Sequence, residues 1–204
     1  MKKVIQIVLA LAIVALAYIM YEQLMTPLRF TKEVEVRERP IVQKLKDIRA
    51  AEQAYRQKYS SYTGDFDSLI NYILYDSMTF AKSMGSLDDS AAVAQGLVTT
   101  ELFRVPVKDT IFGRKVTVDY IKELPIIPHS NNERFFLNAG FVVTESGITV
   151  PVFECKAYFA QYLNDLNRQE LINLIDERVR TFGKFGGLKV GDMESATNDA
   201  GNWE

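Results

Sequence analysis

The longest hydrophobic segment of the chain lies at its beginning. Met1-Lys2-Lys3 is followed by an apolar run from Val4 to Tyr21, in which Gln6 is the only polar residue. At about 1.5 Å per residue, a helix of this length covers most of the ~30 Å hydrocarbon core of a bilayer. The pattern therefore predicts that residues 1–21 form an N-terminal transmembrane signal anchor.

A cleaved export signal is the alternative, because Ala15-Leu16-Ala17 is a small-x-small triplet of the kind found at cleavage sites. The triplet lies inside the apolar run, which favours a retained anchor. Two lysines before the run favour a cytoplasmic N-terminus and place the C-terminal domain outside the cytoplasm. The basic residues after the run leave the opposite orientation open: Arg29, Lys32, Arg37 and Arg39.

Residues 22–59 have the pattern of a juxtamembrane segment and an amphipathic stem helix. Pro40 suits the first turn of a helix. After it, residues recur at spacings of four, three, four, three and four, the period of one helical stripe: Ile41, Leu45, Ile48, Glu52, Tyr55 and Tyr59. Because Glu52 interrupts the stripe, a long coiled coil is disfavoured. We expect the stripe to pack on the chain's own head domain, with a partner-binding helix as the alternative.

Residues 60–185 have the pattern of an α+β domain. The turn-rich stretch Tyr59–Leu69 precedes a second expected helix over Phe66–Met84, capped by Asp65 or Asp67. A polar, small-residue-rich stretch from Gly85 to Gly96 indicates an exposed loop or a weakly formed helix. Short alternating runs follow between Leu97 and Pro128, and they predict strands over 105–108 and 115–121.

A hairpin is the clearest β signal. Its arms run over 139–145 and 148–153, and Ser146-Gly147 supplies the turn. Pro151 indicates a sheet edge or a bulge. Farther on, Asn167 with Glu170 predicts the start of a helix that ends at Gly183. Residues 186–204 have the composition of an acidic, irregular C-terminal tail.

Together these patterns predict an α+β protein. A transmembrane helix continues into the stem helix, and an antiparallel β-sheet domain flanked by helices follows. With 48% hydrophobic and 25% charged residues, the chain is globular in composition. About 180 residues follow the anchor, which is enough for one domain with a substantial core. The single cysteine, Cys155, forms no internal disulfide, so packing must stabilise the fold.

Charge is distributed unevenly along the chain, although the net charge is only −2. Between residues 34 and 59 there are seven basic and four acidic residues, whereas residues 60–204 contain thirteen basic and twenty acidic ones. A basic stem therefore joins an acidic head to the membrane. Nucleic-acid binding by the head is disfavoured, because neutralising phosphates requires clustered Lys and Arg.

Two segments resemble a known family. Lys46–Tyr55, followed by Tyr59-Ser60-Ser61-Tyr62, resembles the stem helix and loop of type IV pilins and type II secretion pseudopilins. The ending Asn198-Asp199-Ala200-Gly201-Asn202-Trp203-Glu204 is similar to the C-terminus of major pseudopilins. The resemblance implies a calcium ion held by a C-terminal loop. Met1–Gln6 contains neither the cleavage-site Gly nor the following Glu of prepilins, so the resemblance extends to architecture and not to filament assembly.

No catalytic motif is evident. The only histidine, His129, lies in a turn-like stretch, and Cys155 is interpreted as a structural thiol. The glycine-rich segment 183–191 follows a helix instead of opening one, so a flexible turn is favoured over a phosphate loop. For a metal, the tail offers the hard oxygen ligands that Ca²⁺ prefers, with a solvated tail as the favoured alternative: Asp192, Glu194, Asn198, Asp199, Asn202 and Glu204.

The expected function is non-catalytic. We expect a single-pass protein of a bacterial inner membrane, with its C-terminal domain outside the cytoplasm, that acts as a structural or assembly component of the cell envelope. Two alternatives stay open: an accessory subunit of a larger membrane complex, and a membrane-tethered hydrolase or ligand-binding domain. A pocket of converging carboxylates would favour an enzyme, and a flat apolar patch would favour protein contacts.

Overall fold

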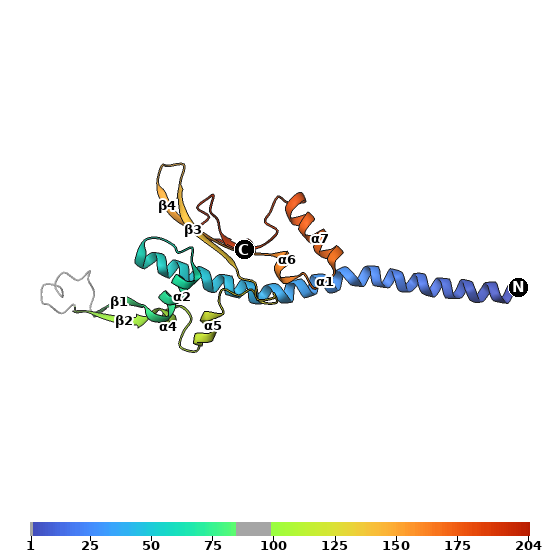
Figure 1. Cartoon of the computed structure of the whole chain (residues 1–204), viewed down its shortest axis with the longest axis horizontal. Coiled ribbons are helices and arrows are strands. Elements are labelled where there is room, and N and C mark those ends of the chain that lie inside the picture. Colours follow the sequence, from blue (N-terminus) through green and yellow to red (C-terminus); the bar gives the residue numbers. More distant parts are fainter. Residues whose placement is uncertain (1, 85–98) are drawn as a thin grey trace.

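The computed structural model describes residues 2–84 and 99–204. One helix, α1 (Lys2–Tyr59), runs through the molecule, and Figure 1 shows its N-terminal part projecting beyond the head. The apolar side chains of this projecting part are exposed, including Val4, Leu16 and Met20. Its length and composition suit a membrane span, although a signal sequence has the same properties.

The helix is continuous through Pro27 and Pro40, so the expected helix start at Pro40 is wrong. A proline removes one backbone hydrogen bond from a helix interior. Side-chain contacts lie next to both positions: Thr31 Oγ1 donates to the carbonyl of Pro27 (2.9 Å), and Arg39 pairs with Glu35 (2.8 Å) in the turn before Pro40. The span and the stem therefore form one element.

The predicted stem stripe is the centre of the core. Ile41, Leu45 and Ile48 are fully buried, as is Glu52, whereas Tyr55 is half-buried and Tyr59 is exposed. Around them lie fully buried side chains from helices, strands and loops: Leu69, Ile73, Ile121, Leu124, Ile127, Phe153, Cys155, Ala157 and Tyr162. The expectation that the stripe packs on its own head domain is confirmed.

The second helix is shorter than expected. Asp65 caps α2 (Phe66–Tyr75) by accepting from Ser68 N, but the chain then enters β1 (Ser77–Met84), which pairs antiparallel with β2 (Thr99–Pro106). Asp76 adopts an extended conformation, and its carbonyl accepts from Val107 N just after β2 (3.0 Å). Pairing with a distant strand therefore ends the helix. The expected loop Gly85–Gly96 lies outside the described residues.

Only part of the next strand prediction is confirmed. Val105 and Pro106 belong to β2, but α4 (Val107–Ile111) follows directly, and residues 118–122 form α5 (Val118–Lys122) instead of a strand. Thr117 Oγ1 caps α5 by accepting from Tyr120 N (3.3 Å). The Tyr120 hydroxyl also donates to Asp47 on α1. Capping and contact with α1 thus override the alternating pattern.

The predicted hairpin is present. Strands β3 (Phe136–Val143) and β4 (Thr149–Tyr158) pair antiparallel, and Gly147 has φ +79° in the turn. Thr144 N donates to the Ile148 carbonyl (2.9 Å). Because hydrogen-bonded pairs alternate along an antiparallel ladder, the backbone N of Pro151, opposite Phe141, points away from β3. Pro151 therefore leaves no ladder bond unmade, because the third strand pairs only with Glu154–Tyr158.

That third strand corrects the expected irregular tail. Residues 187–191 form β5 (Gly187–Gly191), which gives a sheet in the order β3-β4-β5. Leu188 and Val190 on β5 are buried in the core. In Figure 1 the hairpin rises on one side of α1, while β1, β2, α4 and α5 lie on the other.

The last predicted helix is confirmed at both ends. After α6 (Phe159–Tyr162), Asn167 caps α7 (Arg168–Asp176) by accepting from Gln169 N and Glu170 N. A π-helical turn, η1 (Glu177–Thr181), continues it, and Gly183 then takes φ +59°. Figure 1 shows α7 at the end of the head nearest the projecting part of α1.

The substitution Leu45→Ala tests the core. We expect it to lower the free energy of unfolding by about 2–5 kcal/mol, because Leu45 is fully buried and a cavity would remain. Leu102→Ala is the matched control, since Leu102 is exposed, and about 0.5 kcal/mol or less is expected. Urea unfolding of the full chain in detergent, followed by Trp203 fluorescence, measures both. Equal effects would place the stem stripe outside the core.

Candidate functional site

The most unusual polar group of the head is buried between α1 and the C-terminal segment. Glu52 Oε2 accepts a hydrogen bond from the backbone N–H of Thr63 (2.9 Å). Beside it, Asp199 Oδ2 accepts from the Tyr62 hydroxyl (2.7 Å) and from Gln53 Nε2 (3.1 Å). We call these five residues the Glu52 junction; it joins α1, the loop before α2 and the end of the chain.

Glu52 is fully buried, and burial together with the nearby Asp199 raises the pKa of its carboxyl to about 8. Its second oxygen, Oε1, has no hydrogen-bond partner within the described part of the chain. An unpaired carboxylate would cost far more in this environment than a neutral carboxyl. Burial therefore favours the protonated form of Glu52 in the folded protein.

Cys155 also lies in this region, on β4. Its side chain is fully buried, and burial raises the pKa of the thiol well above its usual value. Glu154 adds to this rise because negative charge disfavours the thiolate. An inaccessible, protonated thiol is inert, which agrees with its interpretation as a structural residue.

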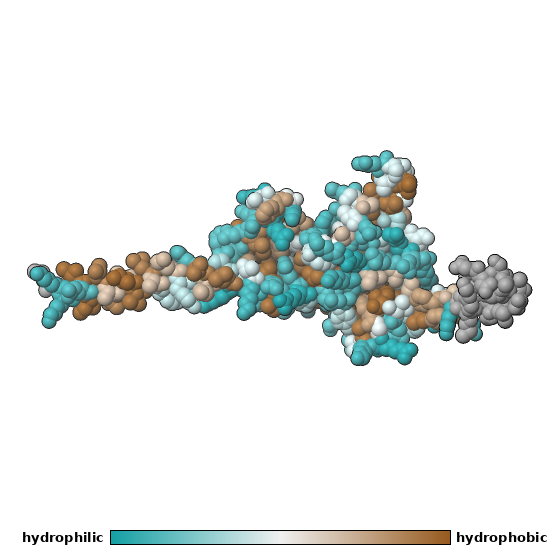
Figure 2. All heavy atoms as spheres, turned by 180° about the vertical axis from the view of Figure 1, so that it is seen from behind, coloured by the Kyte–Doolittle hydropathy of each residue, from teal (hydrophilic) through white to brown (hydrophobic). Residues whose placement is uncertain are grey.

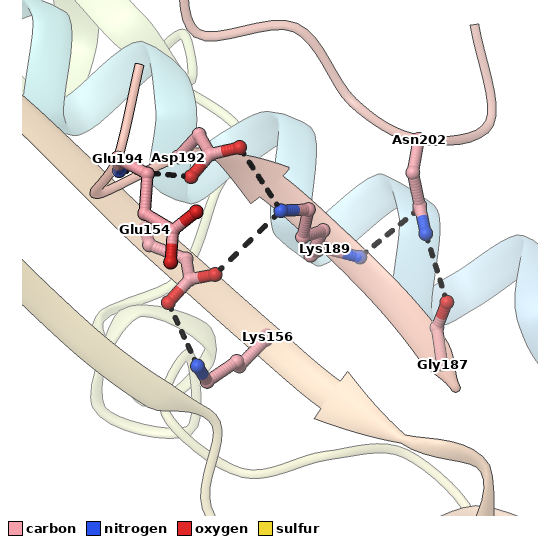
Figure 3. A network of polar contacts seen from close by, with 7 residues as sticks. All are labelled: Glu154, Lys156, Gly187, Lys189, Asp192, Glu194 and Asn202. Carbon is pink, nitrogen blue, oxygen red and sulfur yellow. Dashed lines mark hydrogen bonds and ion pairs between the residues drawn. The ribbon is translucent and has the colours of Figure 1, made fainter. Parts of the chain in front are cut away.

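The C-terminal segment is fastened to α1 and to β5. Arg49 Nη1 donates to the Asp199 carbonyl (3.2 Å) and pairs with Glu204 (2.7 Å). Asn202 accepts from Lys189 N (3.0 Å) and donates to the Gly187 carbonyl (2.9 Å), as Figure 3 shows. The Asn202 side-chain amide thus holds the chain end on β5 at two positions, Gly187 and Lys189.

Several of the six candidate calcium ligands take part in these contacts. Asp192 pairs with Lys189 (3.3 Å), which also approaches Glu154 (3.8 Å), and the same Glu154 pairs with Lys156 (2.8 Å; Figure 3). Asp199 binds Tyr62 and Gln53, and Glu204 pairs with Arg49. Over residues 2–84 and 99–204, no three His, Cys, Asp or Glu side chains converge on one point. Asp192, Asp199 and Glu204 are thus each engaged by side chains of the protein itself.

Comparison with known proteins was negative. No protein-family model, curated protein or solved structure matches this chain.

The other sequence candidates occupy local structural roles. His129 has φ +60° in a turn, where it is not joined to Cys155 by any described contact. Asp65 caps α2, as expected. The glycine-rich segment 183–191 forms a turn and then β5, so it opens no helix. These positions do not assemble a nucleophile with a base.

Sequence reasoning recognised Glu52 only as an interruption of the stem stripe. An acidic residue at a core position of an amphipathic helix indicates a buried polar contact, and this was the feature of the sequence that pointed to the Glu52 junction. Its partners Thr63 and Asp199 could not be assigned, because Asp199 is far away in the sequence. The junction thus places a buried, protonatable carboxyl, Glu52, close to Asp199, through which the chain end is docked.

The substitution Glu52→Gln tests the protonation of this carboxyl. Because its pKa is about 8 when folded against an ordinary 4.5, the folded state binds more protons than the unfolded state between these values. Stability should therefore fall as the pH rises from 4.5 to 8, by on the order of 4 kcal/mol. Glu52→Gln should remove most of this fall, as measured by urea unfolding across that range.

Glu35→Gln is the control, because Glu35 lies exposed on the same helix and pairs with the exposed Arg39. It should retain the pH slope of the natural protein. A Glu52→Gln slope equal to that of the natural protein would show that Glu52 is ionised in the folded state.

Proposed function

We propose that this protein is a membrane-anchored structural component of the cell envelope that holds its head at a fixed distance from the bilayer and acts through protein contacts. The observation that supports this is the double use of one helix. The first third of α1 presents apolar side chains outward, and its last third forms the centre of the head's core. Anchor and head are thus joined without a flexible linker.

The length of α1 gives the spacing. The core begins at Phe30, nine residues after Tyr21, and α1 ends at Tyr59. At about 1.5 Å per residue, the head then extends from roughly 14 Å to roughly 57 Å beyond the apolar run. A spacer of this kind suits a protein that presents contact surfaces to other envelope proteins.

The β3–β4 hairpin supplies a suitable contact surface. Phe141, Val143 and Ile148 near its tip are 64%, 66% and 61% exposed. Figure 2 shows hydrophobic residues on this projecting arm as well as along the N-terminal part of α1. Exposed apolar patches of this kind mark protein interaction sites.

A pseudopilin-like role in a bacterial inner membrane is the specific form of the proposal. It is supported by a long helix packed on an antiparallel sheet.

Cysteine labelling tests the anchor and its orientation. Tyr75 is 82% exposed at the end of α2, and the natural Cys155 is buried, so Tyr75→Cys introduces one accessible thiol. In spheroplasts, a membrane-impermeant maleimide should label Tyr75→Cys and should label Lys3→Cys only after lysis. The reverse pattern would place the head in the cytoplasm, and a protein found in the soluble fraction would reject the anchor.

Photo-crosslinking tests the contact surface. Replacing Phe141 with p-benzoylphenylalanine in the native membrane should give discrete adducts with another protein chain, because the ring projects from the hairpin. The same replacement at exposed Tyr75 is the control and should give at least several-fold fewer adducts. Adducts at Tyr75 with none at Phe141 would exclude the hairpin as the contact surface.

A further inference from the structure

A pocket lies between α1 and the segment that leads into α7. Its volume is about 390 Å³, and it is lined by Thr26, Arg29, Phe30 and Glu33 of α1 together with Leu166 and Asn167. Phe30 is buried, and Leu166 is half-buried against the core, so the pocket has an apolar base. The polar side chains around that base make it a mixed site.

A hydrogen-bond network next to the pocket fixes its walls. Arg37 pairs with Glu33 (3.1 Å) and with Asp165 (2.8 Å to Oδ2), and it donates to the Tyr162 carbonyl (2.8 Å). Arg37 therefore joins α1 to the chain just before α7. Glu33, the carboxylate that lines the pocket, is thus paired with Arg37, which it shares with Asp165.

Arg29 is the positively charged side chain that lines the pocket. Its side chain is exposed, and it forms no ion pair within residues 2–84 and 99–204. A guanidinium presents several donors in a plane that matches the oxygens of a phosphate. A phosphate attached to a hydrocarbon would suit both features, because the phosphate would pair with Arg29 and the hydrocarbon would pack on the apolar base.

The position of the pocket along α1 matches the headgroup layer. If Lys3 lies at one interface, the ~30 Å hydrocarbon core extends over about twenty residues, to about Gln23. The headgroup layer adds several ångströms on each side of the hydrocarbon core. On the side of the head this layer covers residues 24–28, and Leu24 and Leu28 at its two ends are exposed. Thr26, Arg29 and Phe30 are therefore at, or directly above, the level of the phosphates.

We propose that this pocket binds the headgroup of an anionic phospholipid from the leaflet that faces the head. Arg29 would hold the phosphate, Thr26 and Asn167 would contact polar headgroup atoms, and Phe30 with Leu166 would pack on the glycerol and first methylenes. The inference rests on the proposed membrane anchor. It adds a second, lipid-specific attachment that fixes the head against the bilayer surface.

The test uses the full chain in nanodiscs of phosphatidylcholine alone or of phosphatidylcholine mixed with phosphatidylglycerol. Unfolding of the head is followed by the fluorescence of Trp203, the only tryptophan. Phosphatidylglycerol should raise the Tm of the natural protein by roughly 3 °C, because a ligand bound to the folded state stabilises it. Arg29→Gln should abolish this rise, and Arg29→Lys should retain part of it.

Lys32→Gln is the matched control, because it removes the same charge one turn farther along α1 without lining the pocket. It should retain most of the rise; an equal loss in both variants would mean diffuse electrostatic attraction and would overturn the pocket. Inorganic phosphate added to phosphatidylcholine discs should not reproduce the rise, and a rise there would assign the site to free phosphate.

The two proposals fail in different ways in this experiment. A protein that does not enter discs of either composition would refute the membrane anchor. A protein that enters both but shows no dependence of Tm on phosphatidylglycerol would refute only the lipid pocket.

Discussion

The burial of one face of α1 is the interaction on which the rest of the structure depends. The two sheets share no strand, and the β1–β2 pair would be marginal alone, since isolated two-stranded ribbons are barely stable in water. Ile41, Leu45 and Ile48 contribute roughly 1.5–3 kcal/mol each through burial. Their sum is comparable with the whole net stability of a typical domain, about 5–15 kcal/mol. Without this face, the elements on either side of α1 would have no common core.

Charge explains how the chain is fastened around that core. The basic excess predicted for the stem is used within the molecule: Arg37 reaches Asp165, Arg49 reaches Glu204, and Lys58 reaches Asp76. Lys44 donates to the carbonyls of Glu123 and Ile126. Partly exposed ion pairs of this kind add little stability individually, but they define which surface of the head meets which turn of the helix.

The sequence predicted the elements whose signals are local. The Asn167 cap, the Ser146-Gly147 turn and the stem stripe each depend on neighbours within a few residues, and all three are present. Residues 77–84 and 118–122 were assigned to the wrong element because short apolar runs suit either a helix or a strand. Residues 77–84 form a strand because they pair with β2, and residues 118–122 form a helix that contacts Asp47 on α1. Both partners are distant in the sequence. The Glu52 junction and β5 were missed for the same reason.

The uninterrupted path of α1 from its apolar end to Tyr59 has a mechanical consequence. With 3.6 residues per turn, each residue of a helix advances the chain by about 1.5 Å and turns it by about 100°. A single inserted or deleted residue between Tyr21 and Phe30 would therefore rotate the whole head about the helix axis, relative to the apolar end, while hardly changing the distance between them. The number of residues in this part of α1 thus determines the direction in which the β3–β4 hairpin points.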